Sequence, residues 1–386
     1  MASKAEQDGN EHLGGYQDKF WIPRFWSGMS SIALLRLLAR NRFRVHLARV
    51  PMLLVLLFTT SLSTWWGWLQ LLFYGRRIAR TEIREAPIFI LGHWRSGTTL
   101  LHEMLILDRR FAFPDTYACF NPGHFLMTGW WWRPCLSLLL PKVRCMDNMA
   151  LGCRSPQEDE FALCNMGLPS PYLSLMFPGR PPVDQQYLDM AGVAAADRER
   201  WKRGLLWFLK CLTLAHGKRL VLKSPPHTSR IRTLLELFPD ARFIHIHRDP
   251  QVVFPSTVNL LKRLARDQGL QRPEHDGVAD LVFDNFERMY AAFERDRSLV
   301  APTRICDVSY DALVADPVGQ MRRIYESLNL GGFDEVLPAL EKYLAGCADY
   351  RTNRYQVSPE QRAEIDRRWG PLMRKYGYAR EEALAD

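Results

Sequence analysis

Short apolar runs alternate with amphipathic stretches over most of the chain beyond residue 86. Three of these runs, Ile88–Leu91, Arg219–Lys223 and Arg242–His247, are followed by polar residues, and residues 303–308 form a fourth run. Runs of this length and composition are typical of strands in a parallel sheet, because both faces of such strands are buried. Strands that alternate with helices imply right-handed crossovers. The pattern therefore predicts an α/β fold of three layers, with helices on both sides of a central parallel sheet.

Helical spacing follows the predicted strands and dominates the C-terminal third of the chain. We expect helices at residues 98–107, 184–216, 228–238, 250–264, 317–328, 333–344 and 359–376. A further helix should begin at Ser155, since a serine suits the N-cap and Pro156 suits the first turn. Glu158 then takes the position of the capping-box partner.

An uncharged stretch, residues 50–75, lies near the N-terminus. It is rich in Leu, Phe and Trp, is flanked by arginines, and exceeds the roughly 20 apolar residues that a bilayer-spanning helix needs. Several hydroxyl side chains interrupt it. Three interpretations are open: a helix anchored in one leaflet, a helix that spans the membrane, and a helix packed on the protein itself. We expect contact with a membrane surface through residues 20–80, and we divide the chain into a membrane-associating segment, 1–85, and a main domain, 86–386.

Residues 111–132 are dense in Phe, Tyr, Trp, Pro, Gly and His. This composition predicts loops and short helices. The aromatic side chains could form the wall of a pocket for an apolar or ring-bearing molecule, or they could be ordinary core residues. The sequence leaves both possibilities open.

The net charge indicates which partners the protein could bind, and the pattern of cysteines indicates its compartment. The net charge of +9 favours an anionic ligand, a membrane surface or nucleic acid, but the aromatic-interleaved basic patches of nucleic-acid-binding proteins are not evident, so we expect no nucleic acid partner. The eight cysteines form no Cys-x-x-Cys pair, and no Asn-x-Ser/Thr sequence occurs. These features suit a reducing compartment. We expect a cytoplasmic, membrane-associated protein, with a single-pass membrane protein as the alternative.

The loop after the first predicted strand has the spacing of a phosphate loop. Gly92 and Gly97 bracket it, and helical spacing resumes at Thr98. This arrangement directs backbone N–H groups and the positive end of a helix dipole at a phosphate. ATP-binding loops carry a lysine after the second glycine, whereas here Thr98 takes that place and the permanent cation is Arg95. The loop is therefore predicted to hold the phosphate end of a nucleotide without metal-assisted phosphoryl transfer.

Two motifs resemble those of sulfotransferases that use 3′-phosphoadenosine 5′-phosphosulfate (PAPS). The 5′-phosphosulfate loop of that family is matched by Arg95, Ser96, Gly97, Thr98 and Thr99. Trp94 stands where the family has proline. The family's 3′-phosphate motif, an arginine after a strand and a serine eight residues later, is matched by Arg248 and Ser256, and Tyr310 resembles a position near the adenosine. The resemblance covers residues 87–317, and two motifs in the correct order make it specific to this family, whose bacterial members are distantly similar to cytosolic and tyrosylprotein sulfotransferases.

The resemblance implies a P-loop-like fold and the transfer of a sulfuryl group from PAPS to a hydroxyl, or less readily an amine, without a metal. It implies that residues 95–99 bind the 5′-phosphosulfate, while Arg248, Ser256 and Tyr310 bind the 3′-phosphoadenosine end. Arg95 and Lys223 would stabilise charge on the bridging oxygen as its bond to sulfur breaks. The acceptor would be a small molecule, a lipid or a glycan.

The acceptor hydroxyl needs a general base, and the sequence offers candidates of two kinds, a histidine and a carboxylate. Cytosolic relatives carry a histidine two residues after a strand-terminal lysine, whereas here the first histidine after Lys223 is His227. Other relatives use a glutamate. Glu158, Asp159 and Glu160 are therefore rival carboxylates beside His227. Because Glu158 suits a helix cap, we expect Glu160 among the three. Two alternative functions remain: a phosphate-loop kinase or NTPase, and a membrane protein that binds a nucleotide without catalysis.

Overall fold

A parallel sheet forms the centre of the molecule. The computed structural model describes residues 20–139, 152–273, 275–347 and 357–379. The strand order is β2-β3-β1-β4-β5, and every neighbouring pair is parallel. The strands are β1 (Ile88–Leu91), β2 (Phe111–Ala112), β3 (Arg219–Lys223), β4 (Arg242–His247) and β5 (Ile305–Ser309). The predicted α/β fold is confirmed, and only the two-residue strand β2 was not anticipated from the sequence.

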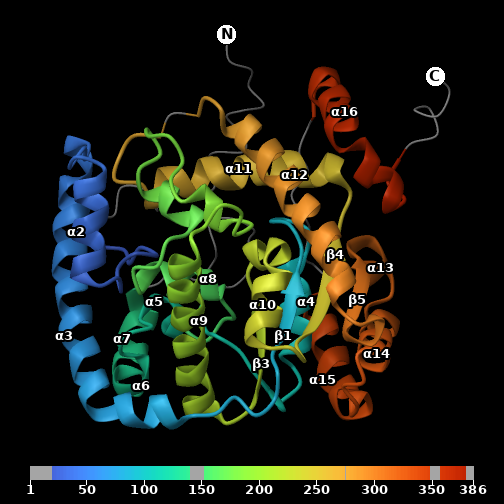
Figure 1. The fold of residues 1–386 in the computed structure, drawn as a ribbon, viewed down its shortest axis with the longest axis horizontal. Coiled ribbons are helices and arrows are strands. Elements are labelled where there is room, and N and C mark those ends of the chain that lie inside the picture. Colours follow the sequence, from blue (N-terminus) through green and yellow to red (C-terminus); the bar gives the residue numbers. More distant parts are fainter. Residues whose placement is uncertain (1–19, 140–151, 274, 348–356, 380–386) are drawn as a thin grey trace.

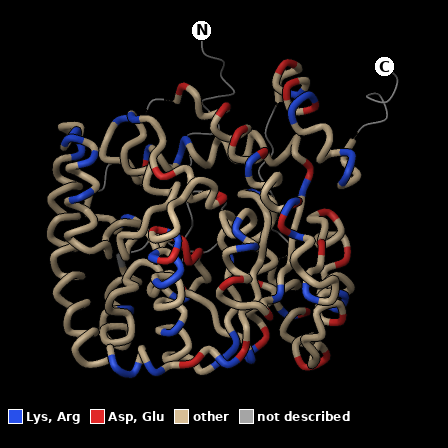
Figure 2. Tube along the Cα trace, viewed as in Figure 1, with Lys and Arg blue, Asp and Glu red and all other residues tan. Residues whose placement is uncertain are grey.

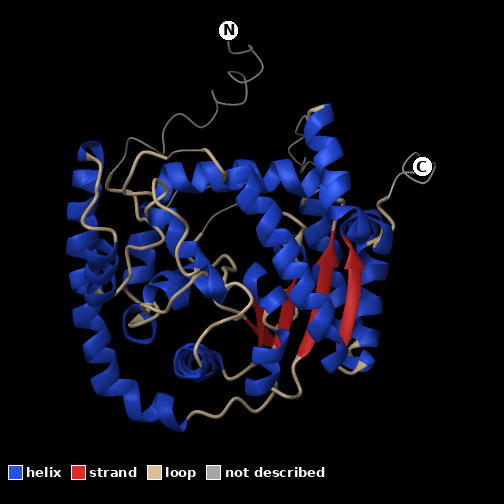
Figure 3. Ribbon diagram, turned by 45° about the horizontal axis from the view of Figure 1, so that its top comes forward, coloured by secondary structure: helices blue, strands red, loops and turns tan. Residues whose placement is uncertain are grey.

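Helices surround the sheet on both faces (Figures 1 and 3). In chain order they are α2 (Ser31–Arg40), α3 (Val50–Arg80), α4 (Thr98–Leu105), α5 (Thr116–Phe120), α6 (Phe125–Thr128), α7 (Trp132–Leu139), α8 (Asp159–Asn165), α9 (Ala195–His216), α10 (Ile231–Leu237), α11 (Pro250–Gln268), α12 (Val278–Asp296), α13 (Tyr310–Ala315), α14 (Pro317–Ser327), α15 (Phe333–Gly346) and α16 (Pro359–Lys375).

The alternation of side chains along β1 separates two hydrophobic cores. Phe89 and Leu91 belong to the core cluster that includes residues of α8, α9 and α12. Ile88 and Ile90 point the other way, into the cluster formed with α4, α14 and α15. Burial of both faces explains why the strand sequences are continuously apolar. The sheet is thereby fixed from both sides, and its strand ends are firm supports for loops.

Three predicted helix starts were wrong. The helix expected from Ser155 begins only at Asp159, because Ser155 is held elsewhere: its carbonyl accepts from Thr116 N, and Pro156 forms an antiparallel bridge with Asp115. Glu158 is therefore an N-cap residue with no side-chain cap hydrogen bond.

The helix predicted over residues 184–216 is also shorter than expected. It begins at Ala195, because Asp184, Met190 and Gly192 all have positive φ angles, which a right-handed helix cannot accommodate. The helix predicted at residues 228–238 is preceded by a 3-10 turn, Pro225–Ser229, and starts at Ile231.

The aromatic residues of the 111–132 segment mostly belong to the core. Tyr117, Phe120 and Phe125 are buried in the cluster on the α8 and α9 side of the sheet. These three side chains are therefore ordinary core residues and do not form a pocket wall. Trp130 is an exception, since 82% of its surface is exposed.

The uncharged N-terminal stretch forms α3, which packs against α2, α6 and α9. By length and composition, Leu47–Arg80 is a helix that could cross a membrane. However, Met52, Leu56 and Ile78 are buried in the same core cluster as the sheet residues, as are Trp26 and Leu34 before them. The division at residues 85 and 86 stays a prediction, and the segments on its two sides share one core.

Candidate active site

The loop between β1 and α4 has the backbone conformation that the motif requires. Gly97 has a φ of 99°, and a Cβ at this position would lie 2.3 Å from Tyr310 Cδ2, so only glycine fits. As the N-cap of α4, Gly97 leaves the first-turn N–H groups without a side-chain cap. The hydroxyl of Ser96 donates to the His93 carbonyl oxygen at 2.7 Å and closes the loop. The loop is thus shaped as a cradle for an anionic group.

The two predicted motifs meet in space. Arg95, which has a φ of 69°, donates from Nε to Ser256 Oγ at 2.8 Å. The guanidinium of Arg248 lies 4.0 Å from the ring centre of Tyr310, and its Nη1 is 3.5 Å from the Arg95 carbonyl oxygen. Arg95, Arg248 and Tyr310, which follow the ends of β1, β4 and β5, therefore form one group with Ser256 of α11, and this group contains two guanidinium cations. That is the charge that a ligand with two separate phosphate groups would need.

Lys223 ends β3 beside the phosphate loop and forms an ion pair with Glu158. The register places Lys223 next to Ile90, two residues before the loop begins. Its Nζ lies 2.8 Å from Glu158 Oε1, and only 3% of the Lys223 side chain and 15% of the Glu158 side chain are exposed. The N-cap position of α8 thus delivers a carboxylate to the edge of the sheet where open α/β folds bind their ligands.

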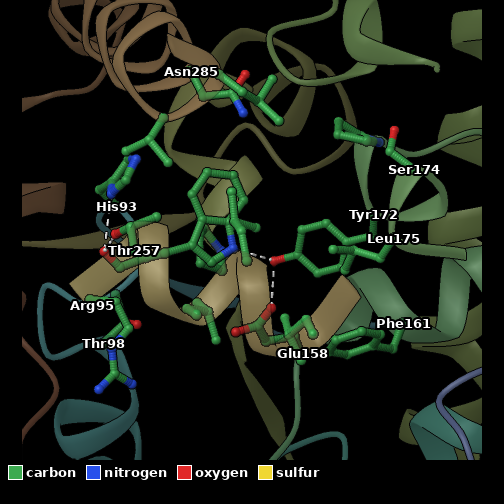
Figure 4. Close-up of a pocket in the computed structure, with 18 of the residues that line it drawn as sticks. His93, Arg95, Thr98, Glu158, Phe161, Tyr172, Ser174, Leu175, Thr257 and Asn285 are labelled. Carbon is green, nitrogen blue, oxygen red and sulfur yellow. Dashed lines mark hydrogen bonds between the residues drawn. The ribbon is translucent and has the colours of Figure 1, made fainter. Parts of the chain in front are cut away.

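Two aromatic side chains hold the second oxygen of Glu158. The Tyr172 hydroxyl donates to Glu158 Oε2 at 2.6 Å, and Trp94 Nε1 donates to the Tyr172 oxygen at 2.9 Å (Figure 4). Burial and then the charge of Glu158 raise the pKa of Tyr172 well above its usual value, so the phenol remains a donor. The Trp94 side chain, at the position of the family's proline, therefore links the phosphate loop to Glu158.

His227 and Asp159 form a closed pair in the interior. His227 Nε2 lies 2.7 Å from Asp159 Oδ2, and both side chains are fully buried. Burial alone would raise the pKa of Asp159, but the charge and hydrogen bonds of His227, with a hydrogen bond from Ser224, outweigh it and lower this pKa. The pair lies behind the strand end, and His227 does not line the pocket described below.

Glu160 is engaged in a second closed pair. Arg230 Nη1 and Nη2 donate to its two oxygens at 2.6 and 3.0 Å, and Ser170 Oγ donates to Oε1 at 2.5 Å. Glu160 and Arg230 are fully buried as well. In Figure 2, acidic residues (red) and basic residues (blue) meet inside the molecule, at the position that α8 has in Figure 1. Among the three consecutive acids at the start of α8, the one directed to the pocket is Glu158.

A pocket begins at the phosphate loop. Its volume is about 1030 Å³, and this value includes the open solvent at its mouth. Its loop end is polar, with Arg95, Thr98, Thr99 and Glu158 in the lining (Figure 4). Its other walls come mainly from α8, the 3-10 turn Pro171–Met176, α11 and α12, and they are mostly apolar, with a few polar side chains such as Ser174, Gln185 and Asn285. The apolar lining residues are Phe161, Pro171, Leu175, Leu260, Leu261, Leu264, Leu281 and Val282. The pocket therefore joins a charged end to an apolar chamber.

A neutral histidine also lines this pocket. The ring of His93 is buried, and burial lowers its pKa to about 4. Its Nδ1 lies 3.0 Å from the Trp94 carbonyl oxygen, an arrangement that suits an Nδ1–H donor. The imidazole is thus uncharged near neutral pH. Neither His93 nor Tyr172 stood out in the sequence, because no motif spacing connects them to the loop.

The chain belongs to the sulfotransferase family. The family's sequence profile, described as "Sulfotransferase family", matches residues 87–335, which contain all of the site residues named above. The chain is therefore a sulfotransferase enzyme, and the family uses PAPS.

Particular relatives support the same conclusion. The chain is 47% identical over 360 residues to the omega-hydroxy-beta-dihydromenaquinone-9 sulfotransferase Stf3 of Mycobacterium bovis, with coverage of 93% of this chain and 92% of that protein. Stf3 of Mycobacterium tuberculosis matches to the same extent. Among solved structures, sulfotransferase STF9 from Mycobacterium avium has a TM-score of 0.63 at 20% identity, with 82% of this chain and 83% of that chain covered. Sulfotransferase STF1 from Mycobacterium tuberculosis H37Rv has a TM-score of 0.60 at 18% identity, with 95% and 96% covered. These two structures share the fold.

The buried pair of Glu160 and Arg230 generates a stability prediction. Arg230→Met should lower the free energy of unfolding by about 3–5 kcal/mol, because it leaves a buried carboxylate without its cation. Arg322→Met, which removes an exposed pair with Asp334, should have little effect. Urea unfolding followed by circular dichroism measures both. Equal small losses in the two variants would show that the buried pair does not stabilise the fold.

Proposed function

We propose that this enzyme transfers a sulfuryl group from PAPS to the hydroxyl of a lipid with a long apolar chain. The observation that carries the proposal is the pocket, whose polar end contains Arg95 and Glu158 and whose chamber is lined by leucines and aromatic rings. The relative Stf3 is named for a hydroxylated menaquinone. A lipid acceptor is consistent with both.

Two features support PAPS as the donor, namely the room at Gly97 and the two guanidinium cations. The 5′-phosphosulfate would lie in the loop of residues 95–99, where Gly97 leaves room that a Cβ would fill. The 3′-phosphate would be held by Arg248 and Ser256, with Tyr310 beside them. When bound, PAPS supplies a sulfuryl group attached to a phosphate leaving group. Arg95 and Lys223 are the cations that would stabilise the negative charge left on the bridging oxygen.

Glu158 is the carboxylate that suits the role of general base, rather than Glu160. It lines the pocket, and Lys223, Tyr172 and Trp94 fix its position. A carboxylate at this place can accept the proton of the acceptor hydroxyl as the bond to sulfur forms. Glu160 and His227 are each enclosed in a buried pair, so we assign them a structural role. The Glu158–Lys223 contact also gives Lys223 a partner until the donor phosphate is present.

The donor assignment is tested by comparing two nucleotides. Arg248→Ala should weaken binding of adenosine 3′,5′-bisphosphate about 10- to 100-fold, since a hydrogen-bonded charge on the phosphate is lost. Binding of adenosine 5′-monophosphate should change little. Isothermal titration calorimetry measures both, and Arg322→Ala, which removes an exposed ion pair with Asp334 of α15, is the control. Equal losses for the two nucleotides would contradict the placement of the 3′-phosphate.

The base assignment is tested by three separate variants. With saturating donor, Glu158→Gln should reduce kcat by about 10²–10⁴-fold, because the variant cannot take the proton. Glu160→Gln and His227→Ala should lower stability more than they lower kcat per folded molecule. Stopped assays with radiolabelled PAPS, corrected for the folded fraction, give these values. If Glu158→Gln keeps its kcat while His93→Gln loses it, the base is His93.

The apolar chamber is tested through the length of the acceptor. Leu261→Asp should raise KM for a long isoprenoid alcohol about tenfold or more, because a charge replaces apolar contact area in the chamber wall. KM for a short alcohol should change less. Val314→Asp, a change at an exposed residue of α13, is the control. The same increase for both alcohols would show that the chamber does not hold the acceptor chain.

A further inference from the structure

The outward face of α3 carries an apolar stripe. Its members follow one another at intervals of three or four residues, which places them on one side of the helix. They are Leu54, Phe58, Leu62, Trp65, Trp68 and Leu72, with exposed fractions of 60%, 65%, 40%, 51%, 64% and 74%. We call this set the outer stripe. It extends for about 27 Å at the helical rise of about 1.5 Å per residue, and a patch of this size marks an interaction site.

The opposite face of α3 is bound to the protein along its length and contains polar contacts. Gln70 Oε1 accepts from Leu126 N at 3.0 Å, and Ser63 Oγ lies 3.2 Å from His124 Nε2. Near the C-terminal end, Lys210 of α9 donates to the Ala79 carbonyl oxygen at 2.9 Å. A helix that crossed a bilayer would draw α9, with its many charged residues, into the hydrocarbon. The contacts therefore favour a helix that lies along a surface.

The charges around the outer stripe are of one sign. Between Lys19 and Thr81 the chain has nine arginines and no Asp or Glu. Exposed arginines stand before α3, at Arg42 and Arg44, and at its end, at Arg76 and Arg77. Figure 2 shows the helix tan over most of its length with blue near both ends. An apolar stripe between cationic ends is complementary to an anionic lipid surface.

The turn between α2 and α3 adjoins the helix that lines the pocket. His46 N donates to the Leu270 carbonyl oxygen at 3.0 Å, and Arg49 Nη2 donates to the Arg266 carbonyl oxygen at 2.8 Å. Leu260, Leu261 and Leu264 of α11, just before these residues, belong to the chamber wall. Phe43 and Leu47 in the turn are 63% and 86% exposed.

We propose that the enzyme docks on an anionic membrane through the outer stripe and the 42–49 turn, with α3 parallel to the bilayer plane. The apolar side chains enter the interface, and the arginines contact lipid phosphates. Docking in this orientation places the α11 end of the acceptor pocket near the membrane. Only this last consequence rests on the proposed function, since the docking itself follows from the stripe and the charges.

The proposal is tested by sedimentation of the full chain with vesicles. Binding should be strong to vesicles of phosphatidylglycerol and phosphatidylcholine and weak to pure phosphatidylcholine, and about 1 M salt should release most of the protein because it screens the arginines. Phe58→Glu with Trp68→Glu should lower the bound fraction about tenfold or more, since charges replace apolar contacts. Leu299→Glu with Val314→Glu, which changes exposed apolar residues elsewhere, should bind as the wild type does.

The following results would overturn the docking proposal. They are equal binding to both vesicle types, retention of the Phe58→Glu and Trp68→Glu variant, and a dimer that this variant dissociates while no lipid binds. Resistance to salt and alkaline carbonate would show a spanning helix, which also contradicts it. An unchanged affinity for adenosine 3′,5′-bisphosphate confirms that each variant is folded. If the wild type binds vesicles but sulfates no lipid, the docking stands and the proposed acceptor fails.

Discussion

The burial of three consecutive acids at the start of α8 is the constraint on which the site depends. Charges removed from water are tolerated only when they are paired, and each of these acids meets a base on the segment that begins at the end of β3. The pairs are Glu158–Lys223, Asp159–His227 and Glu160–Arg230. Because each acid is paired with a base at a fixed position, α8 cannot slide or rotate against the sheet without leaving charge unpaired. The position of Glu158 beside the phosphate loop follows from the two closed pairs behind it.

Within this one short segment, two ion pairs fix the helix and the third lies at the proposed active site. The inner two pairs have no access to the pocket, so they hold α8 in place. The outer pair lies at the pocket, where Tyr172 and Trp94 direct the carboxylate and Lys223, at the end of β3, forms an ion pair with it. The loop is fixed separately, through the Gly97 conformation and the bond between Arg95 and Ser256. The proposed donor and acceptor groups would thus be held by elements whose relative position the sheet determines.

Local spacing predicts much of the fold and the residues of the proposed donor site. The phosphate loop, Arg248 and Ser256 depend on residues close in sequence, and the structure brings them together. Glu158 was assigned to a helix cap because its local pattern fits a capping box, while its partner Lys223 lies 65 residues away and leaves no trace in that pattern. Likewise, the composition of residues 50–75 does not indicate whether the helix spans a membrane or lies along a surface. The contacts of Gln70 and Ser63 with α6 and its N-cap favour a helix that lies along the domain.

We propose that one pocket brings together PAPS at its charged end and a lipid in its apolar chamber, so that the sulfuryl group passes to the lipid hydroxyl. The most direct measurement incubates the purified enzyme with radiolabelled PAPS and a total lipid extract, and then separates the products into organic and aqueous phases. The proposal requires label in a sulfated lipid of the organic phase, formed only with active enzyme. Label confined to small water-soluble products, or adenosine 3′,5′-bisphosphate bound tightly without any transfer, would contradict it.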